Sequence, residues 1–373
     1  MLVLSLKCGM IESTYKVLFE LLSLSLGAEN ARCKPLHLSP EEWQAVYNEA
    51  NRQSVADVAF IAVSKLPKEE RPSQTLLLNW AIHAEMTRFL NKKVNEYAAQ
   101  LTKIFSEAGR RSAVLKGAAN ARLYPDPFSR QCGDVDLWVD GSGESVQKLL
   151  LDLKLLPEPE DIELLYHLRL PKNENGIVAE IHFRPTAGEF FRNREFQAFM
   201  NNEIQKSELV PEGFYSPTIK FALVMQLSHL QHHFYRGGLG LKQYVDYFIL
   251  LKNSTEMERK EVAAIIKSLY MDKTCGAVMW LLGEIFKLDR NMMLCAPNQR
   301  RGKWLLKMAL FGGNFGFYDS NRPKNPSNFM RWVGDRLRVL HYIPFDPINA
   351  IFREWTYWKR TLPLRIKRRK LEL

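Results

Sequence analysis

The segment Gly133-Asp134-Val135-Asp136-Leu137-Trp138-Val139 alternates like a β-strand and carries two carboxylates on one face. Successive side chains of a strand point to opposite faces, so Asp134 and Asp136 are expected side by side, about 6–7 Å apart. Two ionised carboxylates this close repel each other unless a cation lies between them. Such a pair, preceded by a glycine, is suited to holding Mg²⁺ against a triphosphate. The alternative is a solvent-exposed strand of alternating polarity that binds nothing.

A second strand is predicted at residues 177–184, with Glu180, His182 and Arg184 on one face. If this strand lies beside the first with the polar faces together, Glu180 becomes a third carboxylate of the same site. Three carboxylates can hold two divalent ions about 3.5–4 Å apart, one on the triphosphate and one activating a nucleophile. Basic side chains would then surround the phosphates, namely those of Lys116, Arg130, His182 and Arg184.

The segments around these residues predict a small mixed α/β core. Residues 112–115 form a short apolar strand, Lys116-Gly117 marks a turn, and residues 118–123 restart as a helix. A helix is predicted at residues 144–155, and the strands 165–170 and 177–184 are joined by a turn-rich loop. Gly117 would let the backbone approach a phosphate closely, as would Gly133 before the acidic strand.

Helical segments are predicted on both sides of this core. Ser39-Pro40-Glu41-Glu42 has the pattern of a capping box and begins a helix expected to reach residue 65. A helix is expected from about residue 11, and residues 74–109 predict one long helix or two nearly continuous ones. After Pro185, apolar residues recur at helical spacing in five segments: 217–235, 239–252, 257–269, 274–288 and 300–311. The sequence thus predicts an α+β fold, divided into helical residues 1–110, the α/β core 111–200, a helical substrate or lid domain 201–320, and a basic, aromatic-rich helical segment 321–373.

Charge is unevenly distributed along the 373 residues. Residues 298–373 hold 17 Lys or Arg and 5 Asp or Glu, whereas the rest of the chain is nearly neutral. The run Arg365-Ile366-Lys367-Arg368-Arg369-Lys370 could bind nucleic acid or an anionic membrane surface, although a solvated terminus is the favoured interpretation. The aromatic residues among these arginines are expected to be core residues rather than stacking platforms for bases: Trp332, Tyr342, Trp355, Tyr357 and Trp358.

Composition excludes several classes of protein. No run of about 18 uncharged apolar residues exists, so a transmembrane helix is not expected. Charged residues interrupt the apolar N-terminal stretch, which indicates an amphipathic helix instead of a signal peptide and therefore a cytoplasmic protein. The five cysteines are scattered without a C-x-x-C pattern, which argues against a disulfide framework and a structural zinc site.

Together these motifs resemble an uncharacterised bacterial nucleotidyltransferase family of the DNA-polymerase-β-like superfamily. The matching residues are Leu115-Lys116-Gly117, Leu123-Tyr124-Pro125-Asp126-Pro127, Arg130, the acidic strand, and Glu180-Ile181-His182. The resemblance implies transfer of a nucleotidyl group from an NTP such as ATP to an acceptor, with Mg²⁺ and release of pyrophosphate. It assigns Asp134, Asp136 and Glu180 to metal binding and catalysis. The wider superfamily has a serine after its glycine turn, whereas Lys116-Gly117-Ala118-Ala119 has no hydroxyl, so the lysine is expected to contact the phosphate.

Histidines after the core are candidates for covering the pocket, because transfer chemistry requires the exclusion of water. His229 or His233 is expected to face the carboxylates, with Tyr244 or Asp246 as further candidates. The rival interpretation is that these side chains only pack helix against helix. The acceptor is expected to carry a hydroxyl, on a small molecule, a sugar or a protein. Two alternatives remain at this point: an enzyme that adds nucleotides to an RNA end through the basic C-terminus, and a non-catalytic nucleotide-binding protein.

Overall fold

The computed structural model describes residues 9–27, 36–162, 165–187, 191–234, 238–313 and 327–371. Its central sheet has four strands, β1 (Ser112–Val114), β2 (Val135–Val139), β3 (His167–Arg169) and β4 (Ala179–His182), in the order β1-β2-β4-β3. β2 and β4 run parallel, while the outer strands pair antiparallel to them. The structure thus confirms the α+β fold and places β4 beside the acidic strand, with Asp136 opposite Glu180.

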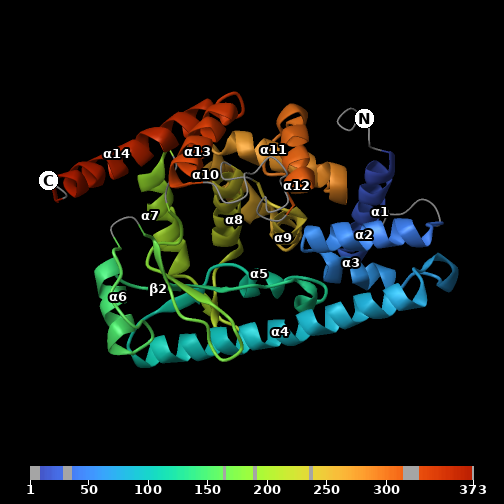
Figure 1. Cartoon of the computed structure of the whole chain (residues 1–373), viewed down its shortest axis with the longest axis horizontal. Coiled ribbons are helices and arrows are strands. Elements are labelled where there is room, and N and C mark those ends of the chain that lie inside the picture. Colours follow the sequence, from blue (N-terminus) through green and yellow to red (C-terminus); the bar gives the residue numbers. More distant parts are fainter. Residues whose placement is uncertain are drawn as a thin grey trace.

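The two faces of this sheet pack against different helices. Val135, Leu137 and Val139 face the long helix α4 (Gln74–Glu107) and form a buried cluster with its apolar side chains. Of the two expectations for residues 74–109, one long helix or two nearly continuous ones, the structure shows the single helix. Because side chains alternate along a strand, Asp136 and Trp138 point the other way, and Asp136 lies across a pocket from α8 (Ile219–Phe234). Figure 1 shows the sheet between α4 and α8.

The N-terminal helices are α1 (Gly9–Ser25), α2 (Pro40–Arg52) and α3 (Ala56–Val63), followed by a 3₁₀ turn at Lys68–Glu70. The predicted capping box is present, with Ser39 and Glu42 bonding reciprocally. The single helix expected over residues 40–65 is wrong, because it breaks into α2 and α3. Ser54 has a φ of 55°, a left-handed backbone that a helix does not continue through.

Around the sheet lie α5 (Ala118–Ala121), a 3₁₀ turn at Pro127–Ser129 and α6 (Gly143–Asp152). Two elements were not expected from the sequence: α7 (Asn193–Ile204) and the short hairpin of β5 (Glu208–Leu209) with β6 (Tyr215–Ser216). The expected helices that follow are α8, α9 (Leu241–Lys252), α10 (Glu256–Ser268), α11 (Asp272–Phe286) and α12 (Gln299–Gly312), with a 3₁₀ turn at Arg290–Met292. One apolar core joins α1–α3 to α8–α12, so segments distant in sequence pack together (Figure 1).

The chain ends in a hairpin of two helices, α13 (Asn328–Tyr342) and α14 (Pro347–Leu371). The first residues of the predicted C-terminal segment 321–373, up to residue 326, lie outside the described residues. Among the helices of the described residues, none combines the length and apolarity needed to span a bilayer.

Candidate active site

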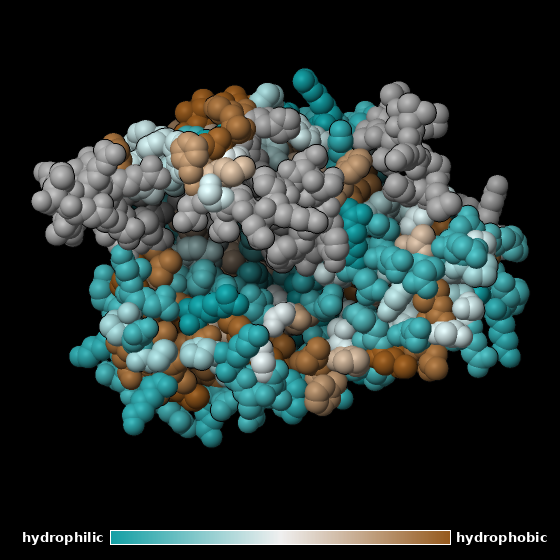
Figure 2. Space-filling model, in the orientation of Figure 1, coloured by the Kyte–Doolittle hydropathy of each residue, from teal (hydrophilic) through white to brown (hydrophobic). Residues whose placement is uncertain are grey.

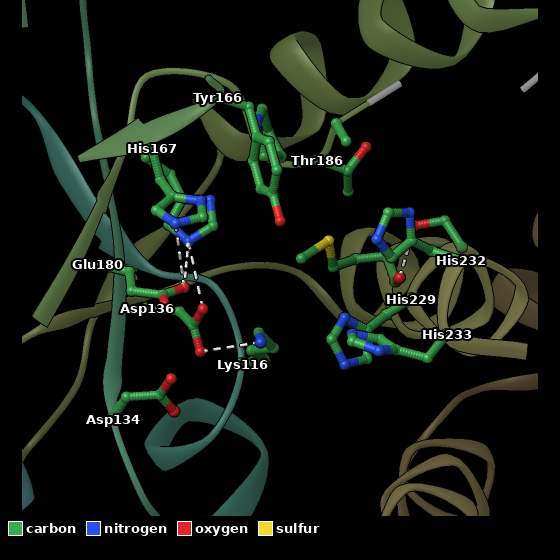
Figure 3. Close-up of a pocket in the computed structure, with 15 residues that line it drawn as sticks. Lys116, Asp134, Asp136, Tyr166, His167, Glu180, Thr186, His229, His232 and His233 are labelled. Atoms are coloured by element: carbon green, nitrogen blue, oxygen red, sulfur yellow. Dashed lines mark hydrogen bonds and ion pairs between the residues drawn. The ribbon is translucent and has the colours of Figure 1, made fainter. Parts of the chain in front are cut away.

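A pocket of about 250 Å³ lies between the polar face of the sheet and α8 (Figure 3). The sheet contributes Asp134, Asp136 and Glu180, and the turn after β1 contributes Lys116. The helix contributes histidines to the opposite wall. The pocket therefore brings together chain segments separated by more than 100 positions.

The three carboxylates converge as expected. One oxygen each of Asp134, Asp136 and Glu180 lies within 4.8 Å of the other two. Asp134 precedes β2 and is exposed, whereas Asp136 is only 2% exposed within the strand. Parallel pairing of β2 with β4 places Glu180 opposite Asp136 and makes this convergence possible. Carboxylate oxygens are the donors that Mg²⁺ prefers, so the donor set fits that ion.

Two basic side chains hold Asp136 in place. Lys116 Nζ lies 3.1 Å from one carboxylate oxygen of Asp136, and His182 Nε2 lies 3.2 Å from the other. Burial opposes ionisation, but the charge of Lys116 and the hydrogen bond from His182 outweigh it and hold the pKa of Asp136 well below its usual range. Asp136 is therefore a carboxylate at neutral pH.

The opposite shift occurs at Glu180. Burial and the neighbouring charges of Asp136 and Asp134 raise the pKa of Glu180. A carboxyl group whose pKa is raised is a better proton acceptor than its ordinary counterpart. The environment thus gives two adjacent acids different roles: Asp136 stays ionised, whereas Glu180 is disposed to exchange a proton.

Lys116 reaches the pocket because of the turn that follows it. Gly117 has a φ of +65°, a conformation that side chains with a Cβ rarely adopt, and it begins α5. Burial alone would lower the pKa of Lys116, but the carboxylates of Asp136 and Asp134 raise it overall. An ammonium group therefore faces three carboxylates, which leaves a negative balance suited to a divalent cation.

Three histidines of α8 line the wall opposite the carboxylates: His229, His232 and His233 (Figure 3). Burial, followed by the charge of Lys116, lowers the pKa of His229 well below its ordinary value. His229 is therefore neutral at physiological pH and presents hydrogen-bonding groups without adding positive charge. The structure places His229 and His233 at the pocket, in agreement with the sequence expectation, while their role in catalysis stays a prediction.

Sequence reasoning missed several residues of this pocket, among them Tyr166, His167 and Thr186. His167 pairs with His182 across β3 and β4, and its Nε2 lies 3.8 Å from Glu180. Burial, together with the charge of His182, lowers the pKa of His167 to about 4. His167 could have been found from the expected pairing of strands 165–170 and 177–184, which places His167 opposite His182.

Arg130 does not line the pocket, contrary to the expectation of a phosphate contact. Its Nε and Nη2 donate to the two carboxylate oxygens of Asp246 at 2.6 and 2.7 Å, and Tyr124 Oη donates to the same carboxylate at 2.6 Å. Arg130 and Asp246 are both buried. This Arg130–Asp246 clamp ties the loop before β2 to α9, so Asp246 faces the arginine and not a substrate.

Four further candidates also lie outside the pocket lining: Gly117, Gly133, Arg184 and Tyr244. Tyr244 is a core residue of α9, only 2% exposed. Arg184 donates through Nη2 to the carbonyl oxygen of Leu165 at 2.7 Å, and Gly133 is an exposed residue ahead of β2. The geometry thus concentrates the site on the carboxylates, Lys116, His182 and the histidines of α8.

Comparisons with known proteins identify the family of this chain. A family described as "Uncharacterised nucleotidyltransferase" matches residues 39–287, which include the whole sheet, Lys116, the three carboxylates and α8. Among solved structures, the chain is similar to an antigenic nucleotidyltransferase-like protein from Paracoccidioides brasiliensis, with 13% identity and a TM-score of 0.35 over 56% of this chain and 95% of that one. No curated protein matches the sequence. Since the family match spans well over half of its residues, the chain belongs to the uncharacterised nucleotidyltransferase family.

Proposed function

We propose that this protein transfers a nucleotidyl group from an NTP to the hydroxyl group of a small molecule, a sugar or a protein, with release of pyrophosphate. The observation that carries the proposal is the convergence of Asp134, Asp136 and Glu180 beside Lys116 in one pocket covered by α8. Family membership supports the reaction class, and the geometry of the pocket supports the residues assigned below.

Asp134, Asp136 and Glu180 would hold Mg²⁺. When bound, the metal neutralises triphosphate charge and lowers the pKa of the attacking hydroxyl. Two observations support the fit: the oxygens already lie within 4.8 Å of one another, and Asp136 is kept ionised although it is buried. The pairing of Asp136 with Lys116 balances part of this negative charge.

The remaining residues bind, orient and move protons. Lys116 neutralises charge on the triphosphate as a point charge, in the place of the superfamily's serine. His182 Nε2 orients Asp136 by its hydrogen bond. Glu180 accepts the proton of the acceptor hydroxyl as the general base. As in other phosphoryl transfers, catalysis rests mainly on positioning and charge neutralisation.

The histidines of α8 would contact the base or the acceptor. They stand across the pocket from the carboxylates and close it from that side (Figure 3). A His233→Ala variant is expected to lose turnover while it retains Mg²⁺ binding, since His233 is not among the clustered metal-ligand candidates. Full activity of this variant with a working acceptor would contradict the assignment.

Nucleotide-dependent thermal stabilisation tests the proposal without a known acceptor. Each NTP is added to the full chain with and without Mg²⁺, and at about 100 times its dissociation constant it should stabilise the fold by roughly 2.7 kcal/mol. Asp136→Asn should abolish the Mg²⁺-dependent part of the shift. Pyrophosphate release in the presence of hydroxyl-bearing acceptors then measures transfer.

Asp140→Asn is the matched control, because Asp140 follows the same strand but is exposed and lies outside the pocket lining. It should leave the nucleotide-dependent shift unchanged. The proposal is wrong if no NTP shifts the melting temperature, or if both aspartate variants behave like the wild type.

A further inference from the structure

The α13–α14 hairpin is fixed to the rest of the protein by its inner side. Val339, Phe345 and Ala350 are buried in the core, and Phe345 packs against Phe234 of α8 with ring centroids 4.3 Å apart. Asn349 Nδ2 donates to the carbonyl oxygen of Tyr270 at 2.8 Å. The orientation of the hairpin is thus determined by packing, and its other side faces solvent.

Exposed apolar side chains follow both helices of this hairpin. Along α14 the exposed residues follow at alternating steps of three and four: Ile348, Ile351, Trp355, Trp358 and Leu362. α13 adds four exposed apolar side chains: Phe329, Met330, Leu337 and Leu340. Figure 2 shows hydrophobic side chains gathered along the upper edge of the molecule, where Figure 1 draws the first turns of α14. We call these nine residues the outer stripe. The expectation that the C-terminal tryptophans are core residues is wrong for Trp355 and Trp358.

The outer stripe lies on a strongly basic element. Residues 328–371 contain eleven Lys or Arg and three Asp or Glu, a net charge of +8. Lys359 Nζ stands 5.0 Å from the ring centroid of Trp355, so a basic group accompanies the exposed apolar surface. Helices with tryptophan and leucine on one face and lysine or arginine beside it lie in the interface of anionic membranes. Tryptophan prefers this boundary because its ring is amphipathic.

The charge decides between the possible occupants of this surface. A second copy of the chain would bring two elements of charge +8 together, and like charges repel. An anionic bilayer attracts such an element and offers an apolar layer for the stripe. α4 provides a contrast, because its exposed apolar residues, such as Leu78 and Phe89, lie on a helix with four basic and three acidic residues.

We propose that the outer stripe of the α13–α14 hairpin binds the surface of an anionic phospholipid bilayer. The apolar side chains enter the boundary between headgroups and acyl chains, while the basic side chains contact the lipid phosphates. The hairpin lies along the membrane without crossing it. This inference is independent of the proposed nucleotidyl transfer, because it uses none of the pocket residues.

Flotation of the full chain with lipid vesicles tests the inference. Vesicles of phosphatidylcholine alone are compared with vesicles that contain about 30 mol % phosphatidylserine. We expect binding to the anionic vesicles only, and we expect salt to weaken it as the Debye length shrinks from about 10 Å at 0.1 M to 3 Å at 1 M. The double variant Ile351→Ser/Trp355→Ser should bind at least about tenfold more weakly, because two exposed apolar groups no longer enter the bilayer.

The control is Leu78→Ser/Phe89→Ser, which removes two exposed apolar side chains from α4 and should leave binding unchanged. A second variant, Arg368→Glu/Arg369→Glu/Lys370→Glu, should also weaken binding and remove most of its salt dependence. Melting temperatures of all variants exclude loss of folding as the cause. The inference is overturned if the wild type does not float with anionic vesicles, if it floats equally with neutral ones, or if the α4 control loses as much binding. It is likewise overturned if the outer stripe proves to mediate self-association in the absence of lipid binding.

Discussion

Replacement of Arg130 by methionine tests whether this residue holds the fold together or binds the triphosphate. The arginine makes two hydrogen bonds to Asp246, at 2.6 and 2.7 Å, and the carboxylate is only 1% exposed. Methionine has similar length but no charge, so the substitution leaves the carboxylate of Asp246 buried, with a hydrogen bond from the hydroxyl group of Tyr124. Removing one partner of a buried ion pair costs about 3–5 kcal/mol, because the other charge is left uncompensated.

The double variant Arg130→Met/Asp246→Leu separates the cost of the lone charge from the value of the pair. It removes both charges, so most of the lost stability should return. The hydroxyl group of Tyr124 then lacks its acceptor, which costs about 1–3 kcal/mol. The double variant is therefore expected to be more stable than Arg130→Met alone, although it carries one substitution more.

Urea unfolding followed by the fluorescence of the eight tryptophans measures these differences. Arg122→Met is the matched control, since Arg122 forms a half-buried ion pair with Glu212 at 2.8 Å. Exposed or half-exposed pairs contribute about 0–1 kcal/mol, so this variant should unfold nearly like the wild type. Nucleotide binding by Arg130→Met, measured under conditions where it is folded, should be retained. A variant with wild-type stability and weakened nucleotide binding would refute the structural role of the clamp.

Three further outcomes are expected. The hydrogen bond between His83 and Asp57, at 2.6 Å, raises the pKa of His83 above its ordinary value of about 6.5. The stability that this hydrogen bond contributes is therefore fully present below the ordinary pKa of histidine and is lost as pH rises through the raised pKa of His83. In a plot of urea midpoint against pH, His83→Gln should remove this pH-dependent loss. Gly302→Ala should destabilise by about 1–3 kcal/mol, because the added Cβ would lie 2.2 Å from the ring of Trp280. Gly334→Ala should stabilise by up to about 1 kcal/mol, because a Cβ added there meets nothing within 4 Å beyond its own stretch of helix. Equal urea midpoints of the two variants would contradict this. Chelation of divalent ions by EDTA should abolish nucleotide-dependent thermal stabilisation, and added Mg²⁺ should restore it; a shift that survives EDTA would argue against a metal at the carboxylates.

The sequence by itself determined the local elements and the polarity of their faces. Alternation along residues 133–139 and 177–184 reports which side chains of one strand share a face, so Asp134 and Asp136 were expected together, and Glu180 was expected beside them if the two strands paired. The capping box at Ser39 and the uninterrupted helical periodicity from Gln74 likewise depend only on neighbouring residues. These features were predictable because the period of a strand or helix is a local property of the chain.

Pairings between distant segments were decided only by the tertiary structure. Arg130 has the charge for a phosphate contact, but its partner is Asp246, 116 positions away on α9. His167 joins the pocket through its register with His182, and Ser54 breaks a helix that periodicity alone would continue. Such outcomes depend on which surfaces are brought together as the core closes, and that choice leaves no local pattern in the sequence.

For the outer stripe too, the sequence determines one part and the tertiary structure the other. Its periodicity in the sequence indicates that α14 has an apolar face, and the arginines beside it are equally visible. Whether that face is covered is decided by the packing of the rest of the chain. Phe345 and Ala350 take the places against the core, and Ile351 and Trp355 remain exposed, at 59% and 54%. A helix can bury only the side that meets the core, so an apolar pattern predicts an apolar face but the tertiary structure alone determines what that face contacts.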